Sequence, residues 1–263
     1  MNPYKIDEEP CVISFSGGRT SAYMLNQFIK ANDGILPDNY HALFCNTGKE
    51  CEETLAFVQR CRDEWETEIV WLEYAEKKTF KQVDYGSASR NGEPFEQLIT
   101  DRNCLPNSQM RFCTGELKVL TIDRYMKSIG INDYTTAIGI RADEPLRVVK
   151  MRAKEDYIVP LASENIGVRD IRDFWEEQGF NLELPTLQDG KCLYSNCDLC
   201  FLKGHGIKLS LIHEGVDPDW WIEQENRIGA RFRNKEPNYQ AMKDYNGDQF
   251  NIFDESIPCF CGD

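Results

Sequence analysis

The sequence predicts an α/β fold with a mostly parallel sheet and helices on both of its faces. Short apolar runs alternate with amphipathic helical segments between residues 11 and 178, and glycine-containing turns separate the first strand–helix pairs. The chain has 263 residues, of which 41% are hydrophobic, so it can bury a substantial core. Because each helix carries the chain back to the starting edge of the sheet, alternating strands and helices favour parallel strands.

Hydrophobic spacing and turn residues predict the individual elements in chain order. Apolar runs bounded by turn residues predict strands, and apolar side chains three and four apart predict helices. Residues 84–112 are rich in Gly, Ser, Asn and Pro, which predicts a loop or lid with short helical pieces. In order, we expect strand 11–15, helix 20–30, strand 41–45, helix 50–64, strand 68–74, helix 113–127, strand 134–140, strand 157–161 and helix 167–178.

Composition and charge limit the classes of partner and the cellular compartment. The formal net charge is −14, which disfavours a broad nucleic-acid surface, although the basic residues between Arg141 and Arg152 could form a local strip. No basic start precedes an apolar run, and no segment approaches the roughly 18 apolar residues of a membrane span. We therefore expect a cytoplasmic protein that has no contact with a membrane.

A turn of small and hydroxyl residues follows the first expected strand. Glycines let backbone amides approach an anion, and the helix that follows adds the positive end of its dipole. The simpler interpretation is a tight turn in which one hydroxyl caps the helix. The strand–turn–helix context favours a phosphate site, although the spacing is neither a Walker A loop nor a dinucleotide motif. The expected binding residues are Ser16, Gly17, Gly18, Arg19, Thr20 and Ser21.

This turn resembles the SGGxDS loop of PP-loop ATP pyrophosphatases, which bind the phosphates of ATP or of a related adenylate. Thr20 stands where those enzymes usually have Asp. Phosphoadenosine phosphosulfate (PAPS) reductases also lack that Asp, so the resemblance points to their branch of the superfamily. It implies a Rossmann-like, adenine nucleotide alpha hydrolase-like fold that binds ATP or PAPS. Whether Mg²⁺ takes part stays open, because the Asp is missing.

Four further segments resemble the same family in the family's order, so that the resemblance covers roughly residues 11–203. They are the segments at Asn46-Thr47-Gly48, at residues 112–119, at residues 139–147 and at residues 160–175. Solvated surface charge is the alternative interpretation of the arginines, but the expected end of a parallel strand favours a ligand site. The resemblance implies nucleotide contacts from Thr47, Gly48, Gly139, Arg141 and Arg147, and a catalytic phosphate or sulfate contact from Lys118.

Eleven cysteines are a high number for a cytosolic chain, where clustered thiols bind metals or carry redox chemistry. Cys197 and Cys200 form a CxxC pair, which resembles a segment of adenylylsulfate reductases, and Cys113 matches an earlier one. The resemblance implies a [4Fe–4S] cluster with four thiolate ligands, and a four-cysteine zinc site is the main competitor. We assign Cys192 as the fourth ligand, with Cys104, Cys259 and Cys261 as alternatives, and interpret Cys11, Cys45, Cys51 and Cys61 as small buried hydrophobes.

The last cysteines suggest a nucleophile. Cys261-Gly262 resembles the cysteine of the PAPS reductase tail, whose thiolate attacks the sulfur of the substrate. Asp263 and the terminal carboxylate disfavour a thiolate there, so a cluster ligand is the alternative role.

Three functions are compatible with these motifs. The first is a PAPS reductase-like enzyme that reduces or transfers sulfur, with a nucleotide substrate and a thiol or electron-donor protein as partner. The second is an adenylating sulfurtransferase that acts on nucleic acid. The third is a non-catalytic nucleotide-binding module with structural zinc. Residues 1–185 would form the PP-loop nucleotide domain and residues 186–263 a cysteine-rich region packed on it, and a homodimer is allowed.

Overall fold

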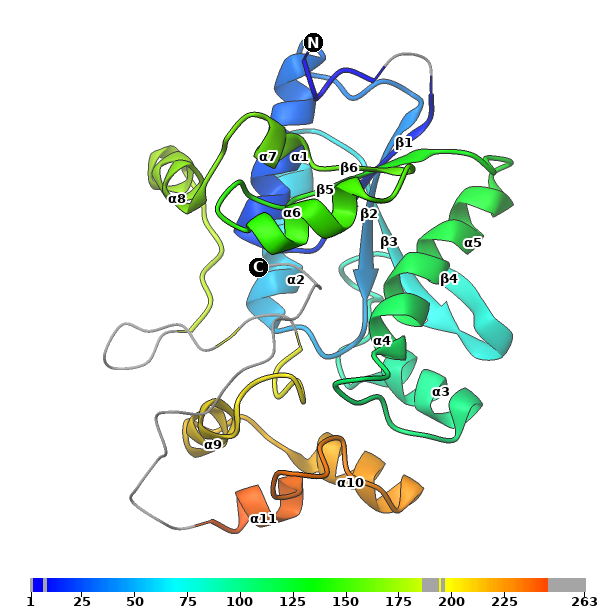
Figure 1. Cartoon of the computed structure of the whole chain (residues 1–263), viewed down its shortest axis with the longest axis vertical. Helices are drawn as coiled ribbons and strands as arrows, with labels where there is room; N and C mark the ends of the chain where they lie inside the picture. The colour runs from blue at the N-terminus through cyan, green and yellow to red at the C-terminus, as the bar shows by residue number, and fades with distance from the viewer. Residues whose placement is uncertain (1, 7–8, 186–193, 195–196, 246–263) are drawn as a thin grey trace.

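The computed structural model describes residues 2–6, 9–185, 194 and 197–245, and its sheet has six strands in the order β4-β3-β2-β1-β5-β6 (Figure 1). All neighbouring strands are parallel except β3 and β4. The expected α/β class is therefore confirmed. The strands are β1 Cys11–Phe15, β2 Tyr40–Asn46, β3 Ile69–Ala75, β4 Thr79–Val83, β5 Thr135–Ile138 and β6 Tyr157–Ile158.

Helices cover both faces of this sheet. A π-helical segment, Gly115–Val119, joins α4 to α5, and a 3₁₀ turn, Glu76–Lys78, joins β3 to β4. The helices are α1 Arg19–Ala31, α2 Glu52–Glu64, α3 Glu93–Arg102, α4 Phe112–Thr114, α5 Leu120–Ser128, α6 Pro145–Arg152, α7 Pro160–Ser163, α8 Val168–Glu177, α9 His205–His213, α10 Asp219–Ile228 and α11 Tyr239–Lys243. None of the helices in the described part of the chain is long and apolar enough to cross a membrane.

Alternate residues of the central strands enter two different cores. Ile13 and Phe44 pack with α1 and α2 on one face. Val12 and Leu43 pack with Ile122 and its neighbours of α5 on the other face. Strands that are buried on both faces need apolar residues at nearly every position, which explains why their sequences read as continuous apolar runs.

The strand order places a ligand site at one edge of the sheet. From β1 the chain runs outward through β2 to β3, and it later returns to the other side of β1 as β5. The direction of winding therefore reverses between β1 and β5. In open α/β sheets, ligands bind at such a switch point, outside the carboxyl ends of the strands.

Several elements differ from the expectations. The edge strand β4 and the helix α6 were not predicted, and the expected lid contains the regular helix α3. The strand expected over 157–161 ends at Ile158, because Pro160 begins α7. Proline cannot donate a ladder hydrogen bond, but its fixed φ suits the first turn of a helix.

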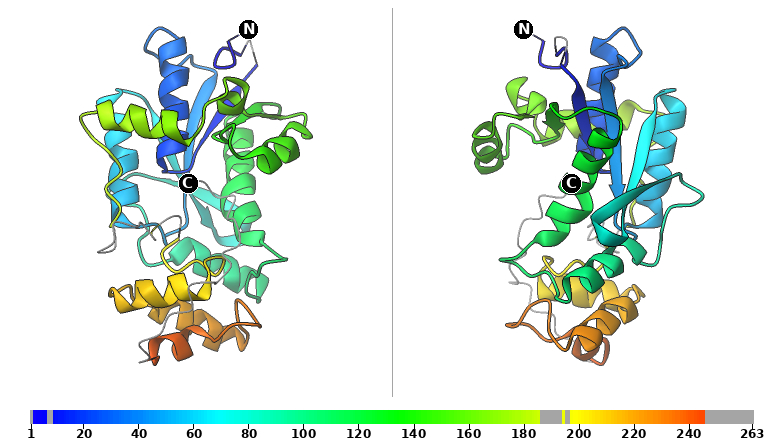
Figure 2. Two further views of the ribbon diagram at one scale, coloured as in Figure 1. Left: turned by 60° about the vertical axis from the view of Figure 1, so that its left-hand side comes forward. Right: turned by 90° about the vertical axis from the view of Figure 1, so that its right-hand side faces the viewer.

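The helices α9 to α11 gather at one end of the molecule, next to α3, in every view (Figure 2). Their core is aromatic: Trp221 is fully buried and lies against Phe95 of α3, with ring centroids 6.0 Å apart. The Trp221 indole donates to Asp198 over 2.9 Å, and the Tyr239 hydroxyl donates to the backbone oxygen of Leu199 over 2.7 Å. The segment that carries Cys197 and Cys200 is thus held against this core.

Candidate functional site

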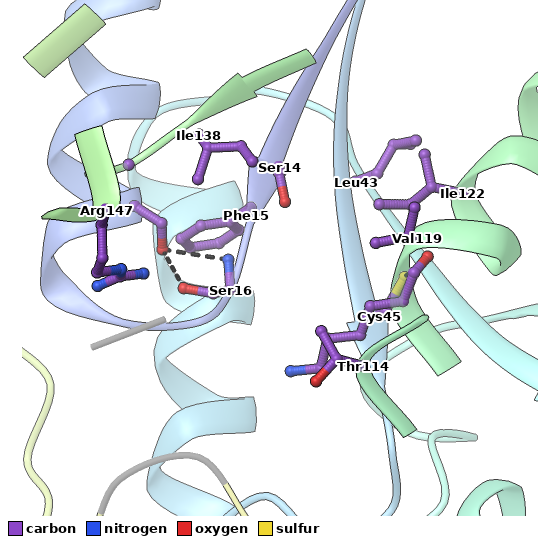
Figure 3. A pocket seen from close by; sticks show the side chains of 13 residues that line it. Ser14, Phe15, Ser16, Leu43, Cys45, Thr114, Val119, Ile122, Ile138 and Arg147 are labelled. Carbon is purple, nitrogen blue, oxygen red and sulfur yellow. Dashed lines mark hydrogen bonds between the residues drawn. The ribbon is translucent and has the colours of Figure 1, made fainter. Parts of the chain in front are cut away.

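The turn between β1 and α1 is closed by the hydroxyl of Ser21. This oxygen accepts a hydrogen bond from the Ser16 backbone amide over 3.1 Å and lies 2.9 Å from the Ser16 hydroxyl oxygen (Figure 3). The Ser21 hydroxyl group also donates a hydrogen bond to the backbone oxygen of Gly18 over 3.0 Å. Both serines therefore sit at the carboxyl end of β1, at the start of α1, where helix N-termini bind anions.

Two glycines let neighbouring elements approach this turn. Gly17 has a φ of +81°, and a Cβ there would lie 2.7 Å from the Thr54 methyl carbon of α2. A Cβ on Gly139, which follows β5, would lie 3.2 Å from the Ser21 Cα. Only the smallest residue allows α2 and the end of β5 to contact the turn this closely.

A cavity of about 100 Å³ lies beside the turn, between β1, β2, β5 and the start of α5. Figure 3 shows Ser16 and Arg147 on one side of it and Val119 and Ile122 on the opposite side. Ser21, Lys118 and Gly139 also line this first cavity, together with the apolar Phe15 and Leu43. Hydroxyl donors and two basic side chains beside apolar walls suit a ligand with a phosphate end and an apolar ring, as in a nucleotide.

The expected arginines are held by a carboxylate that the sequence analysis did not single out. Glu144 accepts a hydrogen bond from the Arg141 backbone amide over 3.0 Å, and its other oxygen pairs with the Arg147 guanidinium. The Arg141 guanidinium also donates to the Thr20 hydroxyl over 3.3 Å. Thr20, at the position of the missing Asp, is therefore linked to the arginine segment. The available signal was the pair of acidic residues, Asp143 and Glu144, between the two arginines.

Arg19 directs its charge away from the first cavity. Its guanidinium donates to the Asn181 side chain over 2.7 Å and to the backbone oxygen of Leu182 over 2.5 Å. Arg19 therefore links the start of α1 to the segment after α8, and its expected contact with a phosphate stays a prediction.

Thr47 and Lys118 meet at a buried carboxylate, Glu50. The Glu50 carboxylate accepts hydrogen bonds from the Thr47 amide over 2.8 Å and from the Thr47 hydroxyl over 2.9 Å, and it lies 4.0 Å from the Lys118 ammonium. In a Thr-x-x-Glu spacing the carboxylate can accept from the backbone amide three residues earlier, and this pattern could have identified Glu50. Gly48, at φ +77°, packs against Gly92, so neither it nor Thr47 is among the residues that line the first cavity.

The π-helical segment that presents Lys118 and Val119 to the cavity is anchored by the buried Glu116. Its two carboxylate oxygens pair with Arg102 and, over 2.8 Å, with Arg124. Burial alone would raise the pKa of Glu116, but the hydrogen bonds from Arg124 and Arg102 outweigh it and hold the pKa below its usual value. This ion triad couples α3 and α5 to the wall of the site.

We expect Glu116→Gln to lower the free energy of unfolding by about 1–3 kcal/mol at neutral pH, because the buried carboxylate loses its ion pairs with the partly buried Arg124 and the exposed Arg102. The lowered folded pKa means that the contribution is complete well above the unfolded carboxyl pKa of about 4.3 and is lost as the pH falls towards the folded value. Urea unfolding at pH 7 and pH 4 should therefore show a smaller gap between wild type and variant at pH 4. The exposed Glu223→Gln serves as the control, and a gap that does not depend on pH contradicts the triad.

The described cysteines separate into buried thiols and a group near the CxxC pair. Cys11, Cys45 and Cys61 are buried as expected, and burial raises the pKa of Cys45 to about 12 although Lys118 opposes it. Cys51 differs from the expectation, because it is only partly buried and lies next to Glu50, whose backbone pairs with that of Cys197.

A buried lysine relates Cys51 to the CxxC pair. Burial lowers the pKa of Lys203, whereas thiolate forms of Cys200, Cys51 and Cys197 would raise it, so these three side chains are neighbours of one buried lysine. Among the described residues, however, no three or more His, Cys, Asp or Glu side chains are arranged to hold a metal ion. Of the expected site residues, Cys192 and Cys261 lie outside the described residues, as does Cys259.

Comparison with known proteins places this geometry in a family. The sequence profile of the phosphoadenosine phosphosulfate reductase domain matches residues 10–159. The uncharacterized nin region protein ORF290 of Escherichia phage lambda is 30% identical over 193 residues, which cover 70% of this chain and 64% of that protein's length. The crystal structure of a PAPS reductase from Candida auris in complex with phosphate is similar with a TM-score of 0.43 and 17% identity, over 67% of this chain and 79% of that one.

Proposed function

The chain belongs to the phosphoadenosine phosphosulfate reductase domain family, and from this premise we propose that it is an enzyme that binds an adenine nucleotide and reduces or transfers sulfur. One observation carries the proposal. The Ser16–Ser21 turn stands at the switch point between β1 and β5 and borders a cavity that Arg147 and Lys118 also line. Anion donors, basic side chains and apolar walls meet there at the edge of the sheet where α/β folds bind ligands.

The residues of the first cavity divide between the two ends of a nucleotide. The phosphoryl end would lie against Ser16, Ser21 and the N-terminus of α1, where hydroxyl donors and the helix dipole favour negative charge. The apolar side chains of Leu43 and Ile122 would contact the adenosine. Arg147 would pair with an oxyanion, with Glu144 holding its guanidinium in place.

Two reactions fit this arrangement. With PAPS, a cysteine thiolate would attack the sulfur, the bond between sulfur and the phosphate oxygen would break, and a dithiol donor would then release sulfite and become oxidised. With ATP, an acceptor oxygen would attack the α-phosphorus and pyrophosphate would leave. In both, Lys118 and Arg147 would stabilise charge that develops on the leaving group. Thr20 in place of Asp supports the first reaction, since it supplies no carboxylate for Mg²⁺.

The proposed metal site stays separate from these steps. Cys113, Cys197, Cys200 and Cys192 remain the proposed thiolates of a [4Fe–4S] cluster, with zinc as the alternative ion. Because the described residues alone do not form a metal-binding group, no step of either reaction is assigned to a metal. Iron, sulfide and zinc analysis of anaerobically purified protein tests this part independently of activity.

Arg147→Ala is expected to weaken binding of the preferred nucleotide about 10- to 100-fold, because a charge-assisted hydrogen bond is lost. Calorimetric titration with ATP and with PAPS measures this effect, and assays for pyrophosphate and for sulfite identify the reaction. Arg172→Ala is the matched control, since Arg172 is an exposed arginine of α8 whose partners are Asp173 and Glu176. Equal losses in both variants, or no binding of either nucleotide by wild type, would refute the proposal.

A further inference from the structure

A second cavity, of about 290 Å³, adjoins the first and is strongly basic. Arg111, Arg147, Lys150 and Lys154 line it, and no acidic side chain is among the described residues of its lining. In a chain with a net charge of −14, this concentration of positive charge is local. Of these four cations the proposed function uses only Arg147, which lines both cavities, so it leaves the other three without a role.

The geometry of α6 directs three of these cations to one side. Arg147, Lys150 and Lys154 are three or four residues apart in sequence, so they lie on one face of the helix and of the turn that follows it. Val148 of the same helix is buried in one cluster with Ile140, which fixes the orientation of the helix. The cations are therefore held along one wall of the cavity.

The rest of the lining is mostly apolar and aromatic. Val119, Ile138 and Met151 supply apolar surface. The ring of Tyr157 also lines the cavity, and its centre lies 4.6 Å from the Lys154 ammonium. An apolar cavity of about 150 Å³ is enough to hold a benzene molecule, so the second cavity has room for a ring and for an anionic group attached to it.

A phosphate monoester matches both parts of this lining. Its phosphate group carries a charge of about −1.5 to −2 at neutral pH, which suits several converging cations better than the single charge of a carboxylate does. Arginine pairs with phosphate oxygens through two parallel hydrogen bonds, and lysine binds phosphate as a point charge. An apolar or aromatic body attached to the phosphate can pack against Val119, Met151 and Tyr157.

We infer that the second cavity binds a small organic phosphate monoester, a ligand separate from the nucleotide at the phosphate turn. Arg111, Lys150 and Lys154 bind its phosphate group, and the apolar wall of the cavity binds its organic body. The inference goes beyond the proposed function and does not depend on it, because it needs neither a nucleotide nor a reaction.

Calorimetric titration with phenyl phosphate, inorganic phosphate and benzoate tests this inference. Wild type is expected to bind phenyl phosphate about tenfold more tightly than either of the other two, because inorganic phosphate lacks the ring and benzoate lacks the second negative charge. Phenyl phosphate is also expected to bind when the protein is saturated with ATP or PAPS, whichever it prefers, because the two ligands occupy different cavities.

The variant Lys150→Gln/Lys154→Gln is expected to weaken binding of phenyl phosphate at least about tenfold, because two charge-assisted contacts are lost. Its affinity for the preferred nucleotide should change less than about twofold. Both lysines are exposed, so we expect the variant to fold, which its thermal unfolding checks. The variant Lys77→Gln/Lys78→Gln is the matched control, because it makes the same change in net charge at two exposed lysines of the turn before β4.

Four results overturn the inference. They are no binding of phenyl phosphate, equal affinity for inorganic phosphate or benzoate, an equal loss of affinity in the control variant, and displacement of phenyl phosphate by the preferred nucleotide. The last result would make the second cavity a part of the nucleotide site. If neither ATP nor PAPS binds to wild type, the proposed function fails, while the titration with phenyl phosphate still decides the inference.

Discussion

Gly17→Ala is expected to abolish nucleotide binding and to lower the free energy of unfolding by about 2–6 kcal/mol. Gly17 has a φ of +81°, which strains any residue with a Cβ, and the added methyl would lie 2.7 Å from the Thr54 methyl carbon, 3.2 Å from the Phe44 ring and 3.3 Å from a Val58 methyl carbon. Relief of these contacts has to move the turn away from α2 and β2. The Ser16 and Ser21 hydroxyls would then lose the arrangement that faces the first cavity. Calorimetric titration with nucleotide and urea unfolding measure the two effects.

Gly34→Ala separates strain from contact. Gly34 also has a positive φ, +91°, but an added Cβ would meet nothing within 4 Å. In this variant only the strain of the left-handed backbone lowers the free energy of unfolding, so the loss is expected to be smaller than in Gly17→Ala. Nucleotide binding is expected to be normal. Adding Thr54→Ser to Gly17→Ala removes the nearest methyl and should restore part of the stability. If Gly17→Ala and Gly34→Ala behave alike, close packing at the turn has no special role.

Trp221→Ala is expected to lower the free energy of unfolding by about 3–5 kcal/mol, because a fully buried indole is replaced by a cavity. The Trp221 ring contacts Phe95, Phe232 and Tyr239, which belong to three separate segments. Its loss should loosen α9 to α11 and the CxxC segment before it affects the sheet. Hydrogen exchange by mass spectrometry should therefore show faster exchange in residues 197–245 than in β1 or β2.

Trp221→Phe tests the hydrogen bond to Asp198 separately from the packing. Phenylalanine keeps most of the aromatic contact but has no hydrogen-bond donor. The substitution should therefore lower the free energy of unfolding by about 1–3 kcal/mol, because Asp198 loses the indole that donates to it. Uniformly faster exchange throughout the chain in Trp221→Ala would show instead that the C-terminal helices and the sheet unfold as one unit.

The local features of the molecule follow from the sequence alone. The α/β class, the strand–turn–helix at residues 11–31 and a helical stretch over residues 113–127 were all predicted, because hydrophobic spacing and glycine turns act between near neighbours. The π-helical segment that carries Lys118 within this stretch was not predicted. The edge strand β4 was not predicted, because at the edge of the sheet its TFKQV sequence is mostly exposed and lacks an apolar run. Strand 157–161 was overextended, because Pro160 suits a helix start as well as a strand end.

The contacts within the site were decided only by the tertiary structure. Arg19 belongs to the phosphate motif in sequence, yet its guanidinium binds the segment at Asn181 and Leu182. Cys51 resembles a core cysteine in sequence, yet the pairing of Glu50 with Cys197 brings it near the CxxC pair. Such contacts join residues more than a hundred positions apart. They depend on strand order and on competition between neighbouring side chains for partners, and no local pattern of residues records either.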